Sequence, residues 1–65
     1  MNGIIKRVVP DRGFGFIAGE DGTGYFFHRD ELHGLDFANL KLGERITFES
    51  QQSPKGPRAG NVRQA

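Results

Sequence analysis

Apolar and polar residues alternate with a period of two in several short stretches of the chain. Residues 3–9 are rich in β-branched side chains, and in residues 44–50 Ile46 and Phe48 alternate with polar neighbours. Successive side chains of a strand point to opposite faces, so this pattern favours half-buried strands over helices. A last short strand is predicted at 59–63. The pattern therefore predicts an all-β protein.

A hairpin is predicted in the first half of the chain. Two aromatic runs, 12–17 and 25–28, flank a loop at 19–24 that contains three glycines and two acids. Glycine adopts positive φ without steric cost, which makes this loop strong turn chemistry. Two β-rich runs around such a loop are typical of an antiparallel hairpin.

The faces of this hairpin have two assignments. In the first, Phe14 and Phe16 both lie in the core, as large apolar residues often do. In the second, Gly15 lets the strand bend and both rings lie outside. On the other strand, His28 is less often buried than Phe, so we expect it to face outward and to take Phe26 with it.

The second assignment gives an exposed group of rings beside a cation. Every nucleic-acid base has a π-face, and its stacking on an aromatic side chain contributes roughly 1–3 kcal/mol. This assignment therefore predicts a surface for unpaired bases, flanked by Arg12 and formed by Phe14, Phe16, Phe26 and His28.

Turns and loops are predicted between the strands. Pro10 and Asp11 make a turn, because proline cannot donate a hydrogen bond in a central strand. Asp30 is predicted to be the N-cap of a short turn through His33. Residues 51–57, with two prolines and a glycine, are predicted to form a polar loop.

Five short strands with one long mid-chain connection predict a five-stranded antiparallel Greek-key barrel, the OB-fold. On strand count alone the alternative is an SH3-like barrel, which would carry an acidic loop and a proline-reading aromatic groove. Neither is clear in the sequence. The predicted core consists of Ile5, Val8, Ile17, Tyr25, Phe27, Leu32, Leu42, Ile46, Phe48 and Val62.

Length and composition set further bounds. The 65 residues suffice for one domain, residues 1–65, with a limited core. The chain has no cysteine, so it has no disulfide and no thiolate metal site. No apolar run approaches the roughly 20 residues of a membrane span, and no signal-peptide pattern opens the chain. We expect a cytoplasmic protein without a membrane partner. The net charge of +1 carries little information, so electrostatics depends on where the nine basic residues lie.

Residues 28–33, His-Arg-Asp-Glu-Leu-His, contain side-chain types found in catalytic and metal sites. The chain is too short for a kinase fold, which would use a related motif. The helical His-Glu-x-x-His spacing of zinc sites is absent, and so is a Walker-type phosphate loop. We therefore expect no enzymatic activity, no metal and no cofactor.

The hexamer Arg-Gly-Phe-Gly-Phe-Ile at 12–17 resembles the first ribonucleoprotein motif of the cold-shock domain family, and Phe-Phe-His at 26–28 resembles the second. Residues 3–6 resemble the opening strand of that family and residues 42–49 its fourth strand. Residues 55–62 resemble its closing turn and last strand. The resemblance covers nearly the whole chain in the right order, which makes it specific.

The resemblance implies binding of single-stranded RNA first and single-stranded DNA second, including pyrimidine-rich strands, by a monomer. It also implies RNA-chaperone activity or a role in cold adaptation or gene expression. Phe37 would touch nucleic acid at the edge of the stacking rings, although as a residue of the long loop it is equally a lid on the barrel. The cations next to phosphates would be Lys6, Arg7, Arg12, Arg29, Lys55 and Arg58, each of which could also be ordinary solvated surface.

The chain departs from the family pattern at the stacking surface. Where the family usually has a surface Trp on its first strand, this chain has Arg7, followed by Val8 in place of an aromatic. After the His of the second motif the family usually has Phe, whereas this chain has Arg29. The predicted surface is poorer in rings and richer in cations. This leaves an alternative function, a protein-interaction barrel with a degenerate nucleic-acid face.

Overall fold

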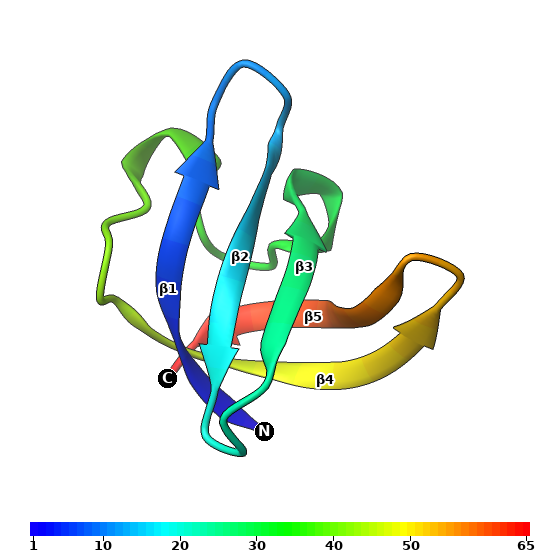
Figure 1. Cartoon of the computed structure of the whole chain (residues 1–65). Helices are drawn as coiled ribbons and strands as arrows, with labels where there is room; N and C mark the ends of the chain where they lie inside the picture. Colours follow the sequence, from blue (N-terminus) through cyan, green and yellow to red (C-terminus); the bar gives the residue numbers. More distant parts are fainter.

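The computed structural model describes residues 1–65 and forms a closed barrel of five strands (Figure 1). The predicted all-β fold is confirmed. Two short 3-10 turns lie between the third and fourth strands, and no helix has the length and hydrophobicity needed to span a bilayer. The elements are β1 (Asn2–Val9), β2 (Phe14–Gly19), β3 (Gly24–His28), η1 (Arg29–Glu31), η2 (Phe37–Asn39), β4 (Arg45–Ser53) and β5 (Gly56–Gln64).

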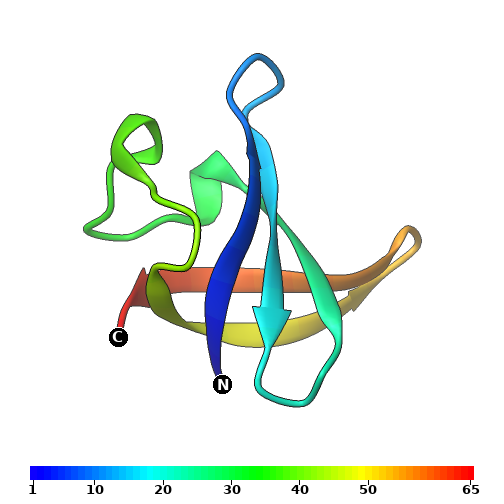
Figure 2. The same ribbon diagram turned by 60° about the vertical axis from the view of Figure 1, so that its left-hand side comes forward.

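The strand order around the barrel is β1-β2-β3-β5-β4, and β4 pairs back onto β1. Strands β1 to β3 form a meander, and the long β4–β5 hairpin runs across one end of it with its tip beyond β3 (Figures 1 and 2). Because β3 lies beside β5 and not beside β4, the chain traces a Greek key. The β3–β5 contact is parallel and pairs Phe26 with Arg58, whereas the other strand pairs are antiparallel, as predicted.

Inward-facing side chains fill the barrel. Two of the predicted core residues, Val8 and Leu32, are only partly buried and pack against the cluster of buried side chains. The prediction for Leu42 is wrong, because its side chain is 70% exposed. The backbone N–H of Gly43 donates to the Ile5 carbonyl (2.7 Å), which holds this turn against β1 and leaves Leu42 outside. The buried hydrophobic residues are Ile5, Ile17, Tyr25, Phe27, Ile46, Phe48, Ala59 and Val62, all but Ala59 as predicted.

The predicted polar loop 51–57 is mostly strand, which corrects that prediction. The ladder between β4 and β5 continues to the pair Ser53 and Gly56, so only Pro54 and Lys55 form the turn. The hydroxyl of Ser53 donates to the Gly56 carbonyl (2.7 Å) and accepts from the Lys55 N–H (3.3 Å). Gly56 has φ +114°, a conformation that side chains disfavour. Side-chain hydrogen bonds and one glycine thus close a tight hairpin in a stretch whose composition is typical of a loop.

The cap of η1 also differs from the prediction. The N-cap is His28, whose Nδ1 accepts a hydrogen bond from the Asp30 N–H (3.1 Å). Asp30 lies inside the turn, and its carboxylate is 3.4 Å from the same ring nitrogen. The capping geometry fixes the orientation of the His28 ring at the end of β3.

The loop between β2 and β3 is closed by the one tyrosine of the chain. The Tyr25 hydroxyl donates to the Asp21 carboxylate over 2.6 Å, and the Thr23 N–H donates to the same group (3.0 Å). These bonds hold the pKa of Asp21 below its usual value, the tyrosine bond contributing most, and the same bond raises the pKa of Tyr25. The polar end of an otherwise buried ring is thereby satisfied.

Candidate nucleic-acid interface

Three aromatic rings gather on the outer face of β2 and β3. The ring centroids of Phe14 and Phe26 are 5.3 Å apart, those of Phe14 and Phe16 are 5.9 Å apart, and those of Phe16 and Phe26 are 6.0 Å apart. Phe16 is 37% exposed, and the other two rings are half-buried. His28 lies opposite Phe14 in the ladder and is half-exposed. We call these four side chains the aromatic platform.

Gly15 explains why Phe14 and Phe16 face outward. Gly15 occupies a position of β2 whose side chain would face the barrel interior, and its ladder partners are Val8 and Phe27. A Cβ at Gly15 would collide with the Arg7 carbonyl oxygen and lie 2.7 Å from the Phe27 ring. The inner face of β2 at this point therefore has room only for a glycine, and the two phenylalanines on either side of it point to the other face.

A row of side chains crosses four strands on the outer face. Arg7 on β1 lies opposite Phe16, Phe16 lies opposite Phe26, and Phe26 lies beside Arg58 on β5. Directly opposed residues on adjacent strands share a face and lie close together. The row therefore has a cation at each end and two rings in the middle.

Further cations border the platform on the side of β1 and the β1–β2 turn. Lys6 lies at an irregularity of the β1–β2 ladder, between Ile5 and Arg7, and is exposed. Arg12 is exposed in the turn. The backbone N–H of Arg29 donates to the Gly13 carbonyl (2.9 Å), and a Cβ at Gly13 would lie 3.1 Å from Cδ of Arg29. Arg12 and Arg29 therefore lie near each other, at the end of the platform formed by Phe14 and His28.

The remaining two predicted cations, Lys55 and Arg58, lie at the opposite edge of the platform. A cleft of ≈ 330 Å³ separates the Phe26 ring from the tip of the β4–β5 hairpin. Its walls carry two prolines and a serine in addition to these cations. The lining residues are Phe26, Ser53, Pro54, Lys55, Pro57 and Arg58.

Phe37 lies apart from the ring cluster of the platform. Its ring is half-buried and meets the buried Phe27 ring edge-on, with centroids 6.5 Å apart. This is the lid position over the barrel. A contact of Phe37 with nucleic acid, which the family resemblance implies, stays a prediction.

One residue beside the platform has no place in the sequence-based prediction. The Glu31 carboxylate lies 3.5 Å from Nη2 of Arg58 and accepts a hydrogen bond from the Asn61 N–H (3.1 Å). These partners are 27 and 30 positions away along the chain. No local pattern signals such a contact, because only the closure of the barrel brings η1 against β5.

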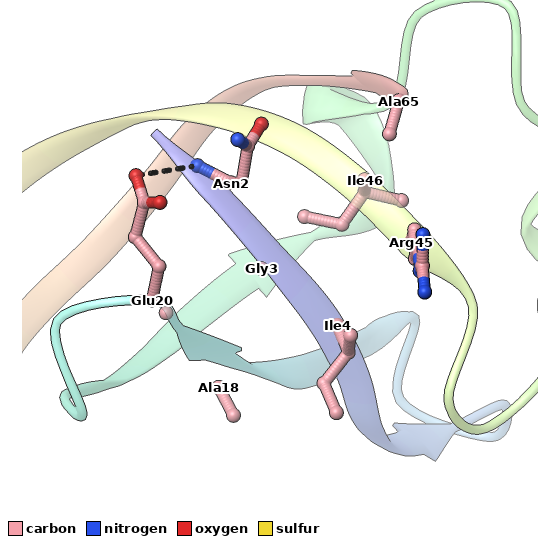
Figure 3. A pocket seen from close by; sticks show the side chains of 9 residues that line it. Asn2, Gly3, Ile4, Ala18, Glu20, Arg45, Ile46 and Ala65 are labelled. Carbon is pink, nitrogen blue, oxygen red and sulfur yellow. Dashed lines mark hydrogen bonds between the residues drawn. The ribbon is translucent and has the colours of Figure 1, made fainter.

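A second hollow on the barrel surface lacks the aromatic rings and the several cations that characterise the platform. It lies where β1 meets β2 and β4 (Figure 3), and its lining contains no ring and a single cation, Arg45. Glu20 borders it and accepts a hydrogen bond from the Asn2 N–H (3.2 Å). The other lining residues are Gly3, Ile4, Ala18, Gly19, Ile46 and Ala65.

Comparison with known proteins gives consistent matches over nearly the whole chain. The family model described as the 'Cold-shock' DNA-binding domain matches residues 1–65. Cold shock protein 2 of Lactiplantibacillus plantarum is 43% identical over 61 residues, which cover 94% of this chain and 92% of the relative. Probable cold shock protein A of Mycolicibacterium smegmatis is 45% identical over 62 residues, with the same two coverages.

A solved structure shares the fold. The Drosophila Unr CSD456 structure superposes on 98% of this chain with a TM-score of 0.72 and 22% sequence identity. This chain spans 26% of that much longer chain. The architecture therefore recurs in a protein whose sequence has diverged widely from this one.

Proposed function

Since the chain belongs to the cold-shock domain family, whose members generally bind nucleic acid and are not enzymes, we propose that it binds single-stranded RNA and also single-stranded DNA. Unpaired bases would stack on the aromatic platform, Phe14, Phe16, Phe26 and His28. The observation that supports this most directly is the outward cluster of three phenylalanines, with centroids 5.3 to 6.0 Å apart. Rings on an outer face, one of them exposed and two half-buried, offer surfaces on which unpaired bases can stack.

Phosphates would be neutralised by the cations at both edges of the platform. Lys6, Arg7, Arg12 and Arg29 would act on one side, and Lys55 and Arg58 on the other. A surface that prefers unpaired strands shifts structured RNA toward its melted form by mass action, which is the basis of an RNA chaperone. We propose this role, or cold-shock-type control of gene expression, for a cytoplasmic monomer with a preference for pyrimidine-rich strands. Phe37 would add a contact at the edge.

The proposed function predicts discrimination against duplexes. A U-rich oligomer of about seven nucleotides fits the site size of one OB-fold. It should bind at least about tenfold more tightly than a duplex of equal length, because pairing hides the base faces from the platform. Fluorescence anisotropy at one fixed salt concentration measures both affinities.

Two other outcomes would point elsewhere. Equal affinity for the single strand and the duplex would mean that charge alone drives binding. An NMR titration with the same oligomer at low salt should shift residues of β1 to β3 and of the long loop that contains Phe37. The absence of any shift would favour the alternative, a protein-interaction barrel.

Arg7 provides a second prediction, because it stands where the family usually has a tryptophan. Its guanidinium is planar and can both stack on a base and pair with a phosphate. Arg7→Trp should tighten binding at moderate salt by about 1 kcal/mol through added stacking area. It should also lower the slope of log affinity against log salt by about 0.7, the value for one phosphate contact on a single strand. Affinity for one U-rich oligomer at three salt concentrations tests both effects.

Ile4→Trp is the control for this experiment. Ile4 is exposed on the same strand, but it borders the hollow of Figure 3 and pairs with Ala18, outside the platform. A ring there should leave affinity and slope unchanged. If Arg7→Trp behaves in the same way, Arg7 lies off the binding surface.

A further inference from the structure

Arg58 is one of two cations in direct register with a platform ring, the other being Arg7. It lies on β5 beside Phe26, at the end of the row that begins with Arg7. Arg58 also lines the cleft between Phe26 and the hairpin tip. A phosphate that follows a base stacked on Phe26 would therefore come within reach of Arg58.

Arg58 is already paired in the free protein, but weakly. Its contact with Glu31 involves one nitrogen and one oxygen at 3.5 Å, and the two side chains are 37% and 28% exposed. Its Nε is buried and has no hydrogen-bond partner. A partly exposed ion pair with a single contact contributes little to stability. The guanidinium therefore has unused donors and only a loose hold on its carboxylate.

The other carboxylate oxygen of Glu31 is firmly placed. It accepts the Asn61 N–H over 3.1 Å, a bond that connects η1 to β5. Asn61 has φ +47°, a left-handed conformation uncommon outside glycine. Glu31 therefore keeps a hydrogen-bond partner and a structural role even when Arg58 moves away from it.

We propose that Glu31 occupies Arg58 in the free protein as an internal substitute for phosphate, and that a phosphate of the bound strand takes Arg58 from it. This rests on the proposed function and adds a built-in competitor to it. A guanidinium can meet a phosphate with two parallel hydrogen bonds, which are stronger than the single long contact with Glu31. Glu31 thereby lowers affinity and makes contact at this edge conditional on a backbone phosphate.

The substitution Glu31→Gln tests the competition. The amide oxygen can still accept the Asn61 N–H, but the negative charge that holds Arg58 is gone. Affinity for a U-rich oligomer should rise about two- to fivefold, the range for removing a weak ion pair. The gain should be largest at low salt, because salt screens an exposed pair. Thermal melts verify that the variant is folded.

Glu20→Gln is the matched control. Glu20 likewise accepts one backbone N–H, that of Asn2, but it has no arginine within ion-pair distance and borders the distant hollow (Figure 3). The Glu20→Gln substitution removes one negative charge from the molecule, as Glu31→Gln does. The affinity of this variant for the oligomer should equal that of the unmodified protein. A similar gain in both variants would mean that any loss of negative charge reduces repulsion of the oligomer, and it would overturn the proposal.

The double variant separates Arg58 from other effects. Arg58→Gln should lower the salt slope by about 0.7, and in that background Glu31→Gln should bring no gain. A full gain without Arg58, or no gain in either background, contradicts the competition. In the unmodified protein, the Nε–H signal of Arg58 should shift on binding while the Asn61 amide stays in place; an unmoved Arg58 signal contradicts it as well. Failure of the unmodified protein to bind would instead refute the proposed function.

Discussion

Phe16→Ala should weaken binding of a U-rich oligomer by roughly 1–3 kcal/mol while the barrel stays folded. Phe16 is 37% exposed and contributes a ring face to the platform without filling the core. Phe26→Ala should have an effect of the same size, since its ring lies within 6.0 Å of Phe16. Affinity by anisotropy and stability by thermal melts, measured on the same samples, separate the two quantities.

The neighbouring ring on β3 provides the contrast. Phe27 is 0% exposed, and its removal by Phe27→Ala should cost roughly 3–5 kcal/mol of stability. So small a domain has little more than that to lose. If Phe16→Ala unfolds the protein as Phe27→Ala does, the platform rings belong to the core and the stacking mechanism fails.

Gly15→Ala should destabilise the barrel by at least the roughly 1–3 kcal/mol typical of overpacking. The new methyl group would meet the Arg7 carbonyl oxygen and the Phe27 ring, 2.7 Å away. Because the first of these is backbone, β1 and β2 would have to separate directly beneath the platform. Urea denaturation followed by circular dichroism measures the loss.

Gly24→Ala is the control for the glycine experiment. Gly24 lies on β3, and a Cβ there meets nothing within 4 Å. This substitution should change stability by no more than about 1 kcal/mol. Equal losses at both glycines would show that strand flexibility, and not the close approach at Gly15, limits the site.

The period-two pattern predicted most of the barrel, because alternation reports directly which residues face the core. It could not decide on which face of β2 the phenylalanines lie, since Phe14 and Phe16 fit either side equally well. The decision comes from the close contact of Gly15 with β1 and Phe27, a tertiary feature. Leu42 was misassigned for a related reason, because an apolar residue in a turn has no strand partner that keeps it inside.

Composition misled the prediction where long-range pairing decides the structure. Residues 51–57 have the amino acids of a loop, yet the ladder between β4 and β5 extends through most of them. The cations proposed for the site were predicted from residue type and from the family pattern. Glu31, the partner of Arg58, was not predicted, because it lies 27 positions away and belongs to a different element.

The parallel contact between β3 and β5 has a consequence for how the barrel opens. There Phe26 pairs with Arg58 in a single ladder position, whereas the neighbouring hairpins are joined along most of their length. Local opening of a folded protein favours regions with few backbone hydrogen bonds, so this seam is where the ring of strands would part first. A strand of nucleic acid that stacks on Phe26 and reaches Arg58 crosses the same seam. Its binding would hold β3 and β5 together at the strand contact with the fewest ladder pairs.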